Sequence, residues 1–195
     1  MQGQTDAALS RRGRWQAARL AGSLGGEGIE AIVSSDLSRA LDTARAIGDA
    51  LGLPVAIDPA LRERCFGVFE GHTYAEIDAR WPEAALRWHR HDADFGPEGG
   101  ERLVDFAARS VAAATRIAEA HAGGTVAVVT HGGVLDCLHR AAVGLALGAP
   151  RTWLLGNTAV NRLLWTGETF TVVGWSDTSH LDGAEPPLDD DAAAR

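Results

Sequence analysis

The hydrophobic pattern of this chain switches repeatedly between short apolar strands and amphipathic helices, and this alternation constrains the fold more than any other feature. The segment 125–130 is continuously apolar and rich in β-branched residues, which is typical of a central strand buried on both faces of a sheet. Shorter strands are expected at 31–35 and 55–58, and apolar residues at helical spacing predict helices in the intervening segments, over 10–24, 37–51, 73–90, 102–121 and 132–147. Strands that alternate with helices predict a three-layer α/β/α sandwich with a mostly parallel sheet.

The boundaries of this predicted domain follow from turn and charge signals. Residues 73–90 are expected to form one or two short helices interrupted near Pro82, and 162–166 with 169–175 a hairpin at the sheet edge. Nothing divides the chain into two parts, so we expect one domain over 1–181. The acidic tail 182–195 is expected to be disordered.

Composition excludes several classes of protein. The sequence has no apolar run of 18 residues and no signal-peptide pattern, so no membrane partner is expected. A net charge of −8 argues against nucleic acid as the partner. The two cysteines, Cys65 and Cys137, have no metal or redox spacing, and a reduced, cytoplasmic location fits best.

Two polar segments follow predicted strands directly. Residues 34–39 come after the strand at 31–35, and residues 130–133 come after the strand at 125–130. Ligands of parallel α/β sheets bind at the carboxyl ends of the strands, where helix N-termini attract anions. The sequence therefore predicts an anion site built from these two turns.

Three side chains are candidates for this site, and each also has a structural interpretation. His131 could simply cap its own loop. Arg39 could be a surface arginine, although a guanidinium in the first helical turn fits better if it binds an anion there. Glu63 could pair with a neighbouring arginine, whereas beside a bound phosphate it would act as a general acid.

The combination and order of the surrounding motifs resemble the histidine phosphatase superfamily, which also contains the cofactor-dependent phosphoglycerate mutases. The resemblance extends from Met1 to about Trp175. It rests on six ordered segments, which are Met1-Gln2-Gly3 with Asp6 and Leu9-Ser10, Ser34–Ala40, Leu61-Arg62-Glu63 with Phe66–Gly71, Gly99-Gly100-Glu101, Val129–Gly133 and Gly156–Asn161.

This resemblance implies a phosphoglycerate mutase-like fold and a two-step phosphoryl transfer through a phosphohistidine. It implies that Arg39 clamps the phosphoryl group, that Glu63 donates a proton to the leaving oxygen, and that His131 hydrogen-bonds the phosphoryl oxygens. Gln2, Gly3 and Gly132 are expected to line the substrate. No metal or other cofactor is implied, because arginine and histidine supply the positive charge.

One departure from the family pattern is plain. In the family, the histidine that attacks phosphorus lies in an Arg-His-Gly motif at the end of the first strand, and the sequence contains no Arg-His-Gly. His131-Gly132 is the single His-Gly pair, and Thr130 precedes it. We therefore expect that this chain lacks both the nucleophile and the first central strand, and that Met1 is an internal methionine of a longer protein.

The resulting prediction is a phosphomonoesterase that hydrolyses a small phosphorylated metabolite in the full-length protein. Two alternatives remain open, an inactive phosphate-ester-binding relative and a cofactor-dependent phosphoglycerate mutase. The loop Glu70-Gly71-His72-Thr73 and the short span from there to Gly99 favour the phosphatase branch, because the mutases usually carry a longer insertion.

Overall fold

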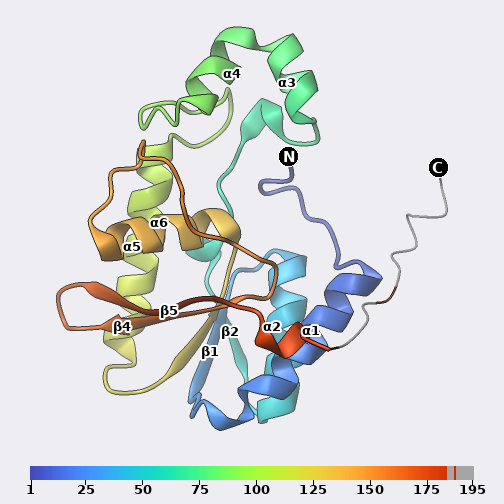
Figure 1. Ribbon diagram of the computed structural model, residues 1–195, viewed down its shortest axis with the longest axis vertical. Helices are drawn as coiled ribbons and strands as arrows, with labels where there is room; N and C mark the ends of the chain where they lie inside the picture. Colours follow the sequence, from blue (N-terminus) through green and yellow to red (C-terminus); the bar gives the residue numbers. More distant parts are fainter. Residues whose placement is uncertain (184–186, 188–195) are drawn as a thin grey trace.

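The computed structural model describes residues 1–183 and 187, and its chain folds into three layers (Figure 1). A parallel sheet with the strand order β2-β1-β3 forms the middle layer, and an antiparallel hairpin, β4–β5, lies apart from it. The strands are β1 (Ala31–Ser34), β2 (Val55–Ile57), β3 (Val126–Val129), β4 (Val160–Trp165) and β5 (Phe170–Asp177). The helices are α1 (Arg11–Ser23), α2 (Ser38–Leu51), α3 (Tyr74–Arg80), α4 (Pro82–His89), α5 (Leu103–Ala120) and α6 (Gly132–Val143).

Side chains that alternate along β1 and β3 bury both faces of the parallel sheet. Ile32 packs against α1 and α2 in a cluster that includes Ala127 and Val129. Val33 points to the opposite face and packs against Ala113 and Ile117 of α5. The predicted α/β/α layering is confirmed, and it follows from the two-residue period of side chains along a strand.

Local signals in the sequence account for most helix ends. The Ser10 side chain caps α1 by accepting a hydrogen bond from the Gly13 N–H (3.1 Å). Residues 73–90 form two helices with Pro82 at the start of the second, as expected. α6 ends at Val143 and not at 147, because Gly144 adopts the left-handed conformation (φ 69°) and stops the helix.

Two predictions about the sheet are wrong for the described part of the chain. Segment 125–130 was expected to be a central strand, yet among the described residues β3 pairs only with β1. The hairpin was expected at the edge of the same sheet, yet it forms a two-stranded sheet of its own. A cavity lined by residues of both strands lies between β3 and β4, so their backbones are too far apart to pair.

Helices α3 and α4 lie beyond the sheet (Figure 1). A separate hydrophobic cluster includes residues of these two helices, and Phe69, Ile77, Ala85 and Phe95 are buried in it. Most of the acidic tail predicted over 182–195 lies outside the described residues. No helix in the described ranges has the length and apolarity needed to cross a membrane.

Candidate functional site

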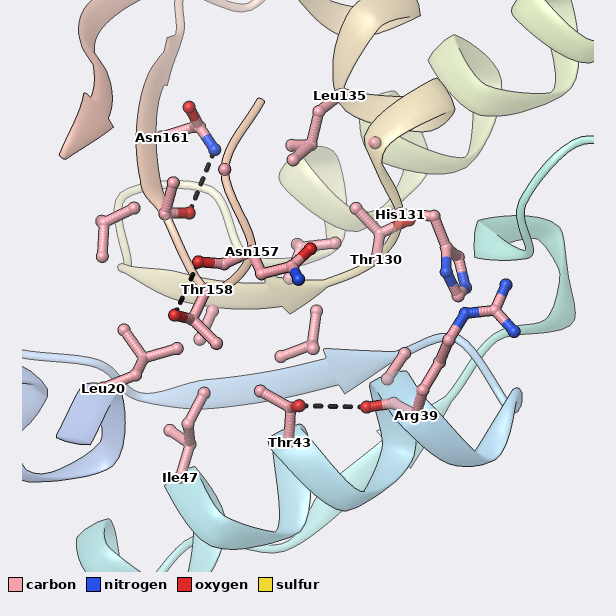
Figure 2. Close-up of a pocket in the computed structure, with 18 of the residues that line it drawn as sticks. Leu20, Arg39, Thr43, Ile47, Thr130, His131, Leu135, Asn157, Thr158 and Asn161 are labelled. Atoms are coloured by element: carbon pink, nitrogen blue, oxygen red, sulfur yellow. Dashed lines mark hydrogen bonds between the residues drawn. The ribbon is translucent and has the colours of Figure 1, made fainter. Parts of the chain in front are cut away.

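The expected site residues meet at the carboxyl ends of β1 and β3. Gln2, Gly3, Arg39, Glu63, His131 and Gly132 all line one cavity of about 1370 Å³. Figure 2 shows the Arg39 guanidinium beside the His131 ring, with Thr130 next to His131 between β3 and α6. The fold thus brings together side chains from segments far apart in the chain, as the position of the two polar turns predicted.

His131 is held as a neutral imidazole. It occupies the N-cap position of α6 and is 7% exposed. Burial lowers its pKa from the ordinary 6.5 to about 3, and the charges of Arg39 and Arg109 add to this effect. Its Nε2 lies 2.8 Å from Ser35 Oγ, which itself accepts a hydrogen bond from the Leu37 N–H (3.3 Å). This side-chain hydrogen bond joins the turn after β3 to the turn after β1.

Arg39 connects α2 to the segment at the start of the chain. Its Nη2 donates to the Gly3 carbonyl (2.7 Å) and its Nη1 to the Thr5 carbonyl (3.0 Å). Desolvation lowers the pKa of the guanidinium, which nevertheless stays charged at neutral pH because its ordinary value is 12.5. Arg39 therefore places a positive charge at the N-terminal turn of α2, with His131 as its neighbour.

Glu63 is a carboxyl group held between two backbone amides. It accepts hydrogen bonds from the Arg64 N–H (2.8 Å) and the Gly133 N–H (3.0 Å). A Cβ at position 133 would come within 2.1 Å of the Glu63 Oε1, so only glycine permits this approach. Burial raises the pKa of Glu63, which outweighs the lowering effect of these bonds. A carboxyl group with a raised pKa is suited to carry a proton and to release it.

The main chain around Glu63 is fixed by an ion pair that the sequence analysis missed. Arg109 of α5 pairs with Glu101 through bonds of 2.8 and 2.9 Å. Arg109 also donates to the carbonyls of Ala60 (2.7 Å) and Arg62 (3.0 Å). Glu101 in turn accepts from the Cys65 N–H (2.8 Å), so the segment is held on both sides of Glu63. Glu101 lies in one of the matched motifs, whereas nothing in the local sequence distinguished Arg109.

The segment at residues 2–5 is held by Glu70. The Glu70 carboxylate accepts from the Gln4 N–H (2.9 Å) and the Thr5 hydroxyl (3.0 Å). Gly3 has a φ of +56°, and a Cβ there would lie 2.2 Å from Glu70 Oε1. The Gln2 side chain is exposed, lines the cavity and has no hydrogen-bond partner among the described residues.

Among the described residues, no three His, Cys, Asp or Glu side chains lie close enough together to hold a metal ion. Cys137 lies buried behind the site, where burial raises the pKa of its thiol to about 12. His139 stacks on Trp153 with ring centroids 4.0 Å apart. These two groups therefore belong to the packing of α6.

The chain combines an α/β fold with a cavity at the carboxyl ends of its parallel strands, and comparison with known families specifies the class of protein. Residues 1–178 match the histidine phosphatase superfamily (branch 1), and the chain belongs to this family. Its relatives include named phosphatases, so the chain falls in a class of phosphate-ester hydrolases.

Individual relatives resemble the chain over most of its length. The glucosyl-3-phosphoglycerate phosphatase of Mycobacterium tuberculosis is 41% identical over 90% of this chain and 83% of its own length. The phosphoglycerate mutase-like protein 4 of Arabidopsis thaliana is 40% identical over 93% of this chain and 80% of its own length.

Solved structures agree with the fold. The structure of a mycobacterial glucosyl-3-phosphoglycerate phosphatase superposes with a TM-score of 0.79 at 37% identity, covering 91% of each chain. The YhfR protein of Bacillus stearothermophilus superposes with a TM-score of 0.85 at 34% identity, covering 93% of this chain and 91% of its own. These neighbours confirm the predicted phosphoglycerate mutase-like fold.

Proposed function

We propose that the cavity at the ends of β1 and β3 is the active site of a phosphomonoesterase that acts on a small phosphorylated metabolite. Arg39 binds the phosphoryl oxygens, and His131 contributes a further hydrogen bond to them. Glu63 gives a proton to the leaving oxygen and takes one from the attacking water. Gln2, Gly3 and Gly132 line the substrate.

The observation that carries this proposal is that a positive charge and a carboxyl group able to carry a proton line the same cavity. Arg39 supplies a fixed positive charge, whereas Glu63 has a raised pKa and lies against the first turn of α6. Phosphoryl transfer needs charge stabilisation on the transferred group and a proton for the leaving oxygen. These two groups meet both requirements without a metal ion in the proposed mechanism.

The family route proceeds through a phosphohistidine, and we propose that this 195-residue chain does not complete it. Among the described residues, His131 is the one histidine that lines the cavity, and its Nε2 faces Ser35. The sequence contains no Arg-His-Gly motif. The chain by itself is therefore expected to bind a phosphate ester without hydrolysing it.

The phosphatase names of several relatives favour hydrolysis over the mutase alternative. The relative in M. tuberculosis is named for glucosyl-3-phosphoglycerate, which makes this compound the first substrate to test here. A sugar phosphoglycerate is a small phosphorylated metabolite of the proposed kind.

The direct test is phosphate binding measured by calorimetry together with hydrolysis of para-nitrophenyl phosphate. The chain is expected to bind inorganic phosphate. Arg39→Ala removes charged hydrogen bonds worth roughly 3 kcal/mol in total, so affinity should fall about 100-fold. Arg45→Ala is the matched control, because Arg45 lies on the same helix in an exposed pair with Asp42 and does not line the cavity. Absence of phosphate binding, or turnover by the unmodified chain, would contradict the corresponding part of the proposal.

A second experiment asks whether the nucleophile is what the site lacks. In the family motif the reactive histidine directly precedes a glycine, and here Gln2 directly precedes Gly3. Position 2 is held by its neighbours, because the Met1 carbonyl accepts from the Gly71 N–H (2.9 Å) and the Gly3 carbonyl from Arg39 (2.7 Å). Gln2→His is therefore expected to produce hydrolysis and a covalent phosphohistidine detectable by mass spectrometry. Gln2→Asn, which adds no nucleophile, should remain inactive.

A further inference from the structure

A bidentate ion pair joins the chain segment that carries Arg39 to the segment that carries Glu63. Arg62 directly precedes Glu63, and Asp36 lies three residues before Arg39. The Arg62 guanidinium donates from Nε to Asp36 Oδ1 (2.7 Å) and from Nη2 to Asp36 Oδ2 (2.5 Å). The planar fork of an arginine fixes both the distance and the direction of its partner carboxylate. The pair therefore restricts how the two segments lie relative to each other.

The remaining polar groups of Arg62 are also bonded. Its carbonyl accepts a hydrogen bond from Arg109 Nη1 (3.0 Å). The third nitrogen of its guanidinium, Nη1, lies 3.5 Å from Gln4 Oε1, and Gln4 Nε2 donates to the Glu63 carbonyl (3.1 Å). Both the side chain and the main chain of Arg62 are thus held, so a shift of Asp36 is transmitted to Glu63.

Asp36 belongs to a turn that is fixed by its neighbours. Ser34 and Ser35 directly before it are completely buried, and Ser35 Oγ lies 2.8 Å from His131 Nε2. Arg39 is the second residue of α2, directly after this turn. Because the connection is short and its start is buried, the place of the Asp36 carboxylate also determines where the Arg39 side chain begins.

The charges of these groups give the geometry a chemical consequence. The hydrogen bonds between Asp36 and Arg62 raise the pKa of Arg62 and hold the pKa of Asp36 below its ordinary value, so both stay ionised at neutral pH. Burial raises the pKa of Glu63, and two backbone hydrogen bonds and the positive charges of Arg39 and Arg109 oppose this effect. Coulomb attraction weakens with distance, so the separation of Arg39 and Glu63 influences how readily Glu63 loses its proton.

We propose that Arg62 and Asp36 are positioning residues, which hold the Glu63 carboxyl at a fixed distance from the Arg39 guanidinium. The two side chains lie outside the lining of the cavity, so they act through Arg39 and Glu63 and not by contact with a substrate. Phosphoryl transfer depends mainly on such positioning. The inference rests on the proposed function, because that proposal makes Arg39 the phosphate-binding group and Glu63 the proton donor.

Two conservative variants separate position from charge. Arg62→Lys keeps the positive charge and loses the fork, whereas Asp36→Asn removes a negative charge and one accepting oxygen. If charge alone mattered, the acid dissociation constant of Glu63 would stay the same in Arg62→Lys and rise in Asp36→Asn. If the pair positions Glu63, both variants should lower that constant about threefold, as expected when two opposite charges move about 2 Å farther apart.

The measurement is an NMR titration of the Glu63 carboxyl carbon in the 195-residue chain, with the signal assigned from its loss in Glu63→Gln. Arg102→Lys is the matched control, because Arg102 forms an exposed bidentate pair with Asp105 through bonds of 2.7 and 2.8 Å. This pair is also outside the lining of the cavity, so the control should leave the acid dissociation constant of Glu63 unchanged.

The direction of the change decides the outcome. An acid dissociation constant that is unchanged or raised in either variant would overturn the inference, and so would an equal fall in Arg102→Lys. Each variant tests the direction by itself, so one that does not fold leaves the other to decide. The titration needs no phosphate. A parent chain that fails to bind phosphate would contradict the proposed function, and the titration would still show whether the pair positions Glu63.

Discussion

The two edges of β3 have opposite environments. Toward β1, which we call the closed side, the backbone is paired in register from Ala31↔Val126 to Ser34↔Val129, and α5 packs over the same region. Toward β4, which we call the open side, the same strand borders a cavity of about 1370 Å³. β3 is thus hydrogen-bonded to a neighbouring strand along one edge and borders a cavity along the other.

This difference shows how the site depends on both sides. Glu63 is held by the Arg109–Glu101 pair and by the first turn of α6, and it lines the cavity on the open side. Gln2, Gly3 and Arg39 line the same cavity. Contacts outside the cavity therefore fix the proposed acid, whereas the cavity on the open side brings it together with the other proposed site residues.

The largest difference in the free energy of unfolding is expected between two variants in which one side chain is shortened, one variant on each side of β3. Ile32, 1% exposed in β1, packs with Ala127 and Val129, and Ile32→Ala should lower the free energy of unfolding by about 3 kcal/mol. Leu164, 57% exposed in β4, lines the open side, and Leu164→Ala should cost about 0.5 kcal/mol or less. Urea unfolding at pH 7 measures both. Equal losses would mean that the open side is packed as tightly as the closed one.

A smaller effect should come from the ion pair that holds Glu63. Arg109→Met leaves Glu101 without its partner and frees the carbonyls of Ala60 and Arg62, which should cost about 2 kcal/mol of unfolding free energy. Arg116→Met, on the same helix, removes an exposed pair with Asp58 and should cost less than about 1 kcal/mol. If the two variants lost the same stability, Arg109 would be no more than a surface arginine.

The smallest expected effect concerns pH and tests whether burial shields the His131 imidazole from water. The folded pKa of about 3 lies below the ordinary 6.5, so the unfolded state binds the proton first. The stability contribution of a neutral His131 is therefore complete above pH 6.5 and decreases as the pH falls toward 3. When the pH is lowered from 6.5 to 4.5, the free energy of unfolding of His131→Asn should fall by about 2 kcal/mol less than that of the parent chain, as measured by urea titrations at each pH. Identical pH profiles would show that water from the open side reaches the imidazole.

Several features of the fold were predictable from local sequence. The alternation of strand and helix periods placed β1–β3 and the helices between them, because side-chain periodicity depends only on near neighbours. The expected site residues Arg39 and His131 follow from polar turns after apolar strands, whereas Glu63 was expected from the loop motif that contains it. Their convergence on one cavity was predictable because parallel strands end at one edge of the sheet.

Other features were decided by contacts between residues distant in sequence. Among the described strands, β4 and β5 pair only with each other, and such pairing depends on which backbones meet in space. The apolar pattern of 125–130 is the same for a strand paired on both edges and for one that borders a cavity. Arg109 carries no local signal, because its role arises only where α5 crosses the segment around Glu63.

The sequence by itself thus determined the layers of this protein, its family and the residues of the proposed phosphate site. The tertiary structure alone decided the protonation of that site and the open edge of β3. Hydrophobic period and motif order are properties of the chain, whereas the pKa values of Glu63 and His131 depend on burial, and strand pairing depends on which backbones meet in space.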